Sequence, residues 1–197
     1  MLGRMLPRLG SSKLVSRWIT ITLVASIVTV IDGGWLAGWL AFEPARVWRG
    51  ELWRLATWVF VAPRPSSLVL TCACLYKLGG DLAHRWGDRK LRRFLIEIVV
   101  GAAGVTTVIA VVVAPIWHLS RVGGWGVCDT LVIGWARQYP DRMLELYGLV
   151  RLSGRNLIAV TVGITCVYAI YVGPLAMAPE LLACAAAYHY PRARLMS

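Results

Sequence analysis

Six apolar runs, separated by short segments rich in arginine and lysine, most strongly constrain how this chain can fold. A bilayer core is about 30 Å thick, so a helix that crosses it needs roughly 20 mostly apolar residues. The runs predict helices over residues 17–32, 66–79, 94–114, 124–137, 156–172 and 174–189. We therefore expect an all-α integral membrane protein, a six-helix bundle forming a single domain over residues 1–197.

The segment over residues 33–65 is rich in tryptophan and is not one of these runs. Tryptophan favours the membrane interface, because its ring is apolar and its N–H needs a polar partner. We expect this loop to lie in the interface, with Pro63 and Pro65 ending it. The second run is short for a full crossing, which predicts a tilted helix or a locally thinned bilayer.

Most of the 21 lysine and arginine residues fall in the segments before residue 17, over 81–93, over 137–155 and after residue 189. These segments lie on one side of a six-span topology, so the positive-inside rule predicts that both termini are cytoplasmic. The net charge of +11 is compatible with nucleic-acid binding by itself. However, the basic residues flank apolar runs instead of gathering on a soluble face, so we expect lipid contact and no nucleic-acid partner.

The five cysteines all lie in or beside apolar runs. Cys72 and Cys74 have C-x-C spacing, but no second pair with metal-ligand spacing accompanies them. We interpret the cysteines as small buried residues and expect no metal site and no cofactor.

Three motifs in a fixed order resemble the rhomboid/Derlin superfamily over about residues 38–187. Residues 49–60 contain Trp53-Arg54 and match the Trp-Arg signature of the first extracytoplasmic loop. Residues 78–87 match the join between the second and third helices, with Ala83 where a glutamate is usual. The third motif is the glycine-rich start of the fourth helix, Gly123–Gly126, together with its end at Tyr139-Pro140-Asp141.

The resemblance implies that every catalytic position of the family is changed in this chain. Trp125 stands at the position of the serine nucleophile and Met177 at the position of the histidine base. Ser67 and Thr71 stand where the family has its oxyanion-stabilising histidine and asparagine. A hydroxyl is a weak nucleophile without a base within hydrogen-bond reach, so we expect a pseudoprotease and not an enzyme.

His118 and Ser120 are the one nearby pair that could supply a different dyad. Residues two apart on a helix point in different directions, and no carboxylate adjoins the pair in the sequence to orient the histidine. We favour an ordinary interfacial pair.

Two acids, Asp129 and Glu180, lie within apolar sequence, each about one helical turn beyond a changed catalytic position. In the resembled fold these two helices pack together, so the carboxyl groups could meet and share a proton. Intramembrane acids are costly and suggest function. A structural hydrogen-bonded pair, and a site for a proton, a cation or a polar group of a substrate, both stay open.

The function implied by the resemblance is a non-catalytic rhomboid-like protein that binds transmembrane segments of client proteins. It would affect their stability, quality control or trafficking, with Trp53, Arg54 and Trp125 facing client or lipid. The alternatives are an active intramembrane serine protease whose site is misaligned, and a small transporter that uses Asp129 and Glu180. Because Derlins commonly carry an ATPase-recruiting tail and this sequence stops at Ser197, we expect the bacterial inner membrane, or the endoplasmic reticulum in a eukaryote. The client and the oligomeric state stay open.

Overall fold

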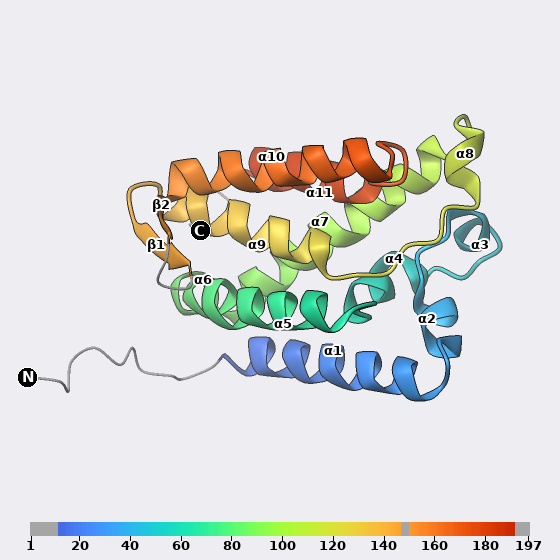
Figure 1. Cartoon of the computed structure of the whole chain (residues 1–197), viewed down its shortest axis with the longest axis horizontal. Helices are drawn as coiled ribbons and strands as arrows, with labels where there is room; N and C mark the ends of the chain where they lie inside the picture. Colours follow the sequence, from blue (N-terminus) through green and yellow to red (C-terminus); the bar gives the residue numbers. More distant parts are fainter. Residues whose placement is uncertain (1–11, 147–149, 192–197) are drawn as a thin grey trace, which may run out of the picture.

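The computed structural model describes residues 12–146 and 150–191 of the chain. This part is mostly helical, and its long helical segments form a bundle (Figure 1). In chain order these segments are α1 (Lys13–Ile31), α5 (Pro65–Cys74) continued by the π-helix η2 (Leu75–Gly79) and α6 (Gly80–Trp86), α7 (Asp88–Ile109), α9 (Trp125–Gln138), α10 (Gly154–Val172) and α11 (Ala178–His189).

Shorter elements connect the long helices. They are α2 (Trp35–Leu40), α3 (Pro44–Trp48), α4 (Arg54–Thr57), the 3-10 helix η1 (Trp58–Phe60), α8 (Ala114–Trp117), and the strands β1 (Met143–Leu146) and β2 (Val150–Ser153). The two strands pair antiparallel, with Met143 opposite Ser153. The sequence analysis predicted no strands here, although Val150-Arg151-Leu152-Ser153 alternates apolar and polar residues as a half-buried strand does.

Helix α9 is the core of the bundle. Every residue from Gly126 to Ala136 is buried, and the helix packs against α5, α7, α10 and α11. A helix that is apolar on all sides must be enclosed by other elements or by lipid. Here protein encloses it, so the start of α9 lies inside the bundle, where the neighbouring helices can form a site around it.

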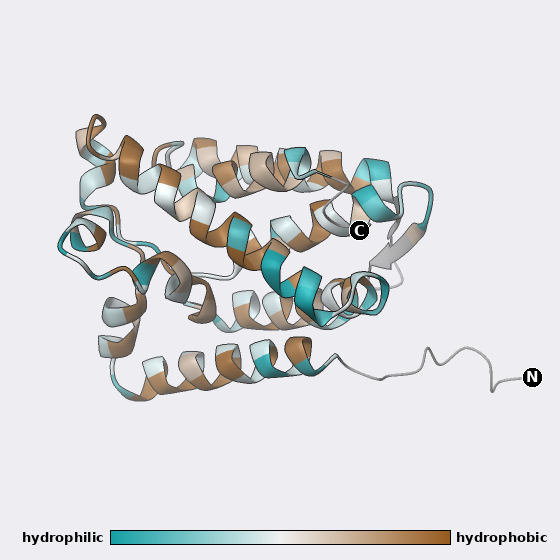
Figure 2. Ribbon diagram, turned by 180° about the vertical axis from the view of Figure 1, so that it is seen from behind, coloured by the Kyte–Doolittle hydropathy of each residue, from teal (hydrophilic) through white to brown (hydrophobic). Residues whose placement is uncertain are grey.

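Helices α1 and α10 are long and apolar enough to cross a membrane. The bent pair Arg54–Phe60 and Pro65–Trp86, with an angle of 102° between its parts, makes a third candidate if it is counted as one span. Large apolar side chains of α1 and α10 point outward, among them Val30, Ile170 and Tyr171, and α1 is apolar along most of its length (Figure 2). Exposed apolar surface of this extent is typical of contact with a membrane. The count of six spans stays a prediction.

The expectation of a short second helix is wrong. The helical segment that begins at Pro65 continues through η2 and α6 to Trp86, and the chain turns at Gly87, which has a φ of +84°. Gly79 and Gly80 do not break the helix, and η2 packs against α1 and α9 at this point. The segment over 81–93, expected as a loop, therefore consists of two helix ends joined at one glycine.

The two ends of the bundle differ in charge and in structure. The start of α1, the α6–α7 turn, the β1–β2 hairpin and the end of α11 lie at one end, whereas α2, α3, α4 and α8 lie at the other (Figure 1). The described basic segments, including the teal start of α7, belong to the first end (Figure 2). Arg4, Arg8, Arg192 and Arg194 lie outside the described residues. Which end is cytoplasmic stays a prediction.

Candidate functional site

A cavity of about 490 Å³ lies at the start of α9, and its lining includes Ser67, Thr71, Trp125 and Met177. These are the four positions that the sequence comparison placed at the catalytic site of the resembled family. They come from α5, from the start of α9 and from the segment before α11. The fold therefore brings together positions that are up to 110 residues apart in the sequence.

Two glycines let the chain enter α9 directly against α5. Gly123 has a φ of +142°, which strains residues with a side chain, and its N–H donates to the carbonyl of Trp58 at 2.9 Å. At Gly124 a Cβ atom would lie 2.5 Å from Thr71 Cγ2 and 2.6 Å from Thr71 Oγ1. The glycine-rich segment thus has a packing role even though the serine of the family is absent.

Replacing Gly124 with alanine is expected to lower the free energy of unfolding by about 1–3 kcal/mol, because the added methyl group overpacks a tight contact. Thr71 is buried and β-branched, so its side chain cannot turn away without a cost. Thermal unfolding of the purified protein in detergent measures the change. Gly163→Ala in α10 is the control, since nothing lies within 4 Å of its added methyl group. Equal losses in both variants would contradict the assignment.

Trp125 contacts α10 through both its polar and its apolar parts. Its Nε1 donates to Thr165 Oγ1 at 3.3 Å, and its ring stacks on Tyr168 with 5.7 Å between the ring centroids and 19° between the planes. Tyr168 also lines the cavity. The indole itself is half-buried.

Asp129 and Glu180 are both buried, but each has a different partner. Asp129 Oδ2 accepts hydrogen bonds from Thr165 Oγ1 at 2.9 Å and from Cys184 Sγ at 3.3 Å. Glu180 Oε1 accepts from Arg121 Nη2 at 2.9 Å. In the described part of the chain no hydrogen bond joins the two carboxyl groups. Each carboxylate thus has hydrogen-bond partners of its own, and the pairing of the two carboxyl groups stays a prediction.

Sequence reasoning missed Arg121, Thr165 and Tyr168 as residues of this site. Arg121 lies outside the four basic segments that the sequence analysis considered. Its position two residues before Gly123 was the one feature of the sequence that could have indicated a place in this site. Nothing in the sequence identified Thr165 and Tyr168 as residues of the site, because threonine and tyrosine are common within apolar helices.

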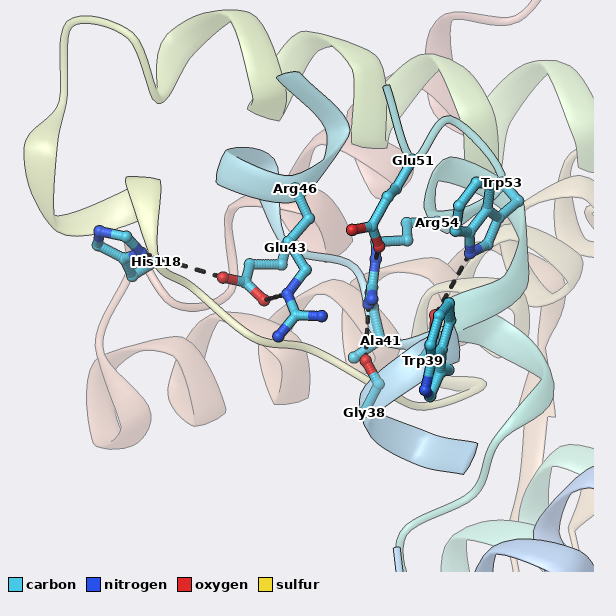
Figure 3. A network of polar contacts seen from close by, with 9 residues as sticks. All are labelled: Gly38, Trp39, Ala41, Glu43, Arg46, Glu51, Trp53, Arg54 and His118. Carbon is cyan, nitrogen blue, oxygen red and sulfur yellow. Dashed lines mark hydrogen bonds and ion pairs between the residues drawn. The ribbon is translucent and has the colours of Figure 1, made fainter. Parts of the chain in front are cut away.

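The Trp-Arg motif has a structural role in the first loop (Figure 3). Arg54 Nη1 donates to the carbonyl oxygens of Gly38 and Ala41, each at 2.7 Å, and Arg54 Nε lies 2.6 Å from Glu51 Oε2. The two carbonyls belong to the last turn of α2 and to its C-cap, where a helix leaves acceptors without partners.

The prediction that Arg54 faces lipid or client is wrong, because its side chain is fully buried. The guanidinium of Arg54 forms charge-assisted hydrogen bonds with several acceptors of the loop. These bonds stabilise the buried side chain more than contacts with lipid headgroups would. Trp53 differs, since 47% of it is exposed while its Nε1 donates to the carbonyl of Trp39 at 3.4 Å. Its contact with lipid or client stays a prediction.

The three histidines lie outside the cavity lining. His118 is exposed, and its Nδ1 lies 3.9 Å from Glu43 Oε1 (Figure 3). Ser120 lines the cavity, but no hydrogen bond joins it to His118 among the described residues. His84 is on α6 and His189 ends α11, both at the other end of the bundle. Across residues 12–146 and 150–191, no cluster of three or more histidine, cysteine or acidic residues could hold a metal ion.

The chain matches the family model described as "Eukaryotic integral membrane protein (DUF1751)" over residues 13–193. This range is most of the chain, and the chain belongs to that family. No curated protein matches it. The protein is therefore an integral membrane protein in contact with a lipid bilayer, and the eukaryotic description fits the endoplasmic-reticulum alternative given above.

Proposed function

We propose that this protein is a non-catalytic rhomboid-like membrane protein that binds transmembrane segments of client proteins. The observation that carries the proposal is the convergence of Ser67, Thr71, Trp125 and Met177 on one cavity. A resemblance drawn from short motifs alone would not require these four positions to meet. Their meeting supports both the family resemblance and the location of a former active site.

The chemistry around the cavity argues against hydrolysis. Its hydroxyl and thiol groups include Ser67, Thr71 and Cys128, and no histidine lines it. Ser67 Oγ donates to the carbonyl of Arg64 at 2.7 Å, and Cys128 Sγ donates to Thr71 Oγ1 at 3.7 Å. A general base must lie within about 2.6–3.2 Å of the group it activates. Glu180 has a carboxylate, but it pairs with Arg121.

The position of the cavity favours a binding role. Its lining includes residues of α5, α9 and α10 together with the segment before α11, so a segment held there would contact several helices at once. Binding there would affect the stability, quality control or trafficking of the bound protein. The eukaryotic family favours the endoplasmic reticulum over a bacterial inner membrane for this role.

A cleavage assay in proteoliposomes tests the absence of catalysis. The purified protein is incubated with a fluorescent transmembrane substrate and with a serine-directed activity probe, and an active rhomboid protease serves as the positive control. We expect neither cleavage nor labelling. Labelling together with cleavage would replace the proposal with an intramembrane serine protease.

A photocrosslinking experiment tests client binding. A photoreactive phenylalanine at position 125 keeps an aromatic ring in the cavity, and the same residue at position 30, where Val30 is 81% exposed on α1, is the matched control. Single-span segments should form adducts at position 125 and not at position 30. Equal adducts at both positions would mean only general contact within the bilayer.

A further inference from the structure

Five basic residues at one end of the bundle carry charges that no acidic side chain of the described residues balances by an ion pair. They come from the start of α1, the end of α6 and the start of α7, and four of them are fully exposed while the rest of their helices pack in the bundle: Lys13, Arg17, Arg85, Arg89 and Arg92, all of which are exposed. Other basic residues of this end do have partners, since Arg93 pairs with Glu97 at 2.6 Å and Arg142 lies 3.6 Å from Asp81. The five unpaired charges are therefore available to a partner outside the chain.

A hydrogen bond between α1 and α7 brings these residues to one surface. The backbone N–H of Leu14 donates to Asp88 Oδ2 at 3.2 Å. Lys13 precedes Leu14 and Arg89 follows Asp88, so the first turns of the two helices meet. The start of α1 and the α6–α7 turn lie at the same end of the bundle (Figure 1), and the start of α7 is hydrophilic (Figure 2). We call the five residues the basic surface; Asp88 adds an opposing charge beside it, but the positive charges outnumber it.

The exposed residues of α1 and α7 indicate the level of the basic surface relative to lipid. On α1 the exposed basic residues end at Arg17, and exposed apolar side chains begin at Ile21, which is 50% exposed. On α7 the same change occurs between Arg93 and Ile96. Basic residues at the ends of membrane helices lie at the level of the headgroups, and the apolar side chains beyond them face the acyl chains. The basic surface is therefore placed to meet lipid phosphates.

Anionic phospholipids have the headgroups that complement this surface. A guanidinium can pair with two phosphate oxygens at once, and four of the five residues are arginines. A zwitterionic headgroup brings a cation of its own, which the basic surface repels, whereas phosphatidylserine and the phosphoinositides have a net negative charge. Clusters of four to eight basic residues beside a membrane helix attract such lipids.

We propose that the basic surface binds the headgroups of anionic phospholipids and enriches these lipids around this end of the protein. None of its five residues lines the cavity at the start of α9, so the inference is independent of the proposed function. A phosphoinositide has a phosphomonoester in addition to its phosphodiester and should bind more tightly than phosphatidylserine. Anionic lipids are concentrated in the cytoplasmic leaflet, so their binding also favours the orientation in which this end is cytoplasmic.

The test uses the full chain, purified in a neutral detergent, and native mass spectrometry to count the bound lipids. A phosphatidylinositol monophosphate, phosphatidylserine and phosphatidylcholine with identical acyl chains are titrated in turn. The phosphoinositide is expected to bind at least about tenfold more tightly than phosphatidylcholine, because each basic residue near the headgroups adds to the attraction. Its affinity should fall as the salt concentration rises, since salt screens exposed charges.

The double variant Arg89→Gln with Arg92→Gln locates the bound lipid. Removing two cations of the basic surface should weaken phosphoinositide binding at least about tenfold. The matched control is Arg46→Gln with Arg49→Gln, which removes the same charge from two exposed arginines of the first loop, at the opposite end of the bundle. The control should bind the phosphoinositide as tightly as the unmodified protein.

A second double variant covers the case in which the first does not fold. Lys13→Gln with Arg17→Gln removes two exposed cations from the first turns of α1 and leaves α7 unchanged. It should weaken phosphoinositide binding by a similar factor. Thermal unfolding in the same detergent shows which variants are folded.

The opposite results would overturn the inference and leave the proposed function standing. Equal affinities for the three lipids would show that the surface does not select anionic headgroups. Equal weakening in the control would show that net charge, and not the basic surface, attracts the lipid. Displacement of the lipid by an equal concentration of inorganic phosphate would make free phosphate the ligand. Displacement by an equal concentration of a glutamate-rich peptide would assign the surface to an acidic protein.

Discussion

Replacing Arg54 with methionine is expected to lower the free energy of unfolding by about 3–5 kcal/mol, as breaking a buried ion pair does in other proteins. The substitution removes the donors to the carbonyls of Gly38 and Ala41 and leaves Glu51 without its partner. Methionine is apolar and similar in length to arginine. The decrease in the free energy of unfolding therefore reports the lost polar contacts more than lost packing. The measurement is thermal or denaturant unfolding in a fixed detergent.

Arg46→Met is the control for Arg54→Met, because both arginines lie in the first loop and each pairs with a glutamate three residues away. The side chain of Arg46 is 45% exposed, so its pair with Glu43 should contribute less than about 1 kcal/mol. A similar loss in both variants would show that burial of Arg54 does not stabilise the loop. Cleavage of the loop by protease should also increase only in the Arg54 variant.

Replacing Arg121 with leucine is expected to lower the free energy of unfolding by about 3–5 kcal/mol, because it leaves the carboxylate of Glu180 buried without a counterion. The carboxylate lies deep in the bundle and accepts its short contact from Arg121. Unfolding experiments at neutral pH measure the loss. The loss should shrink at low pH, because protonation of Glu180 removes the unpaired charge.

The double variant Arg121→Leu with Glu180→Leu tests whether the pair acts as a unit. Removing both charges leaves no unpaired group, so the double variant should recover most of the stability lost in Arg121→Leu. Additive losses in the two single variants and the double variant would contradict a direct coupling.

Arg121 and Glu180 give the cavity a polar character, because they contribute opposite charges to its lining. Trp125 and Met177 place large side chains at two other positions around it.

Several features of this protein could be determined from the sequence alone. The positions of the long helices follow from the apolar runs, because a helix of such residues is stable only when it is buried in protein or lipid. The glycines before Trp125 predicted the start of α9; in the structure Gly123 has a φ of +142°, and Gly124 leaves no room for a Cβ beside Thr71. The four positions that the resemblance singled out, Ser67, Thr71, Trp125 and Met177, line one cavity.

Other features were decided only by the tertiary structure. The second helix continues past two glycines where η2 packs against α1 and α9, and local sequence preferences do not report such contacts. Asp129 accepts hydrogen bonds from side chains of α10 and α11, and Glu180 pairs with Arg121 in the α8–α9 connection. The side chain of Arg54 is buried because it donates hydrogen bonds to carbonyl oxygens at the last turn of α2 and its C-cap. In each case the deciding partner lies far away in the sequence or on another element, so the pairing depends on how the helices pack and not on the order of residues along any one of them.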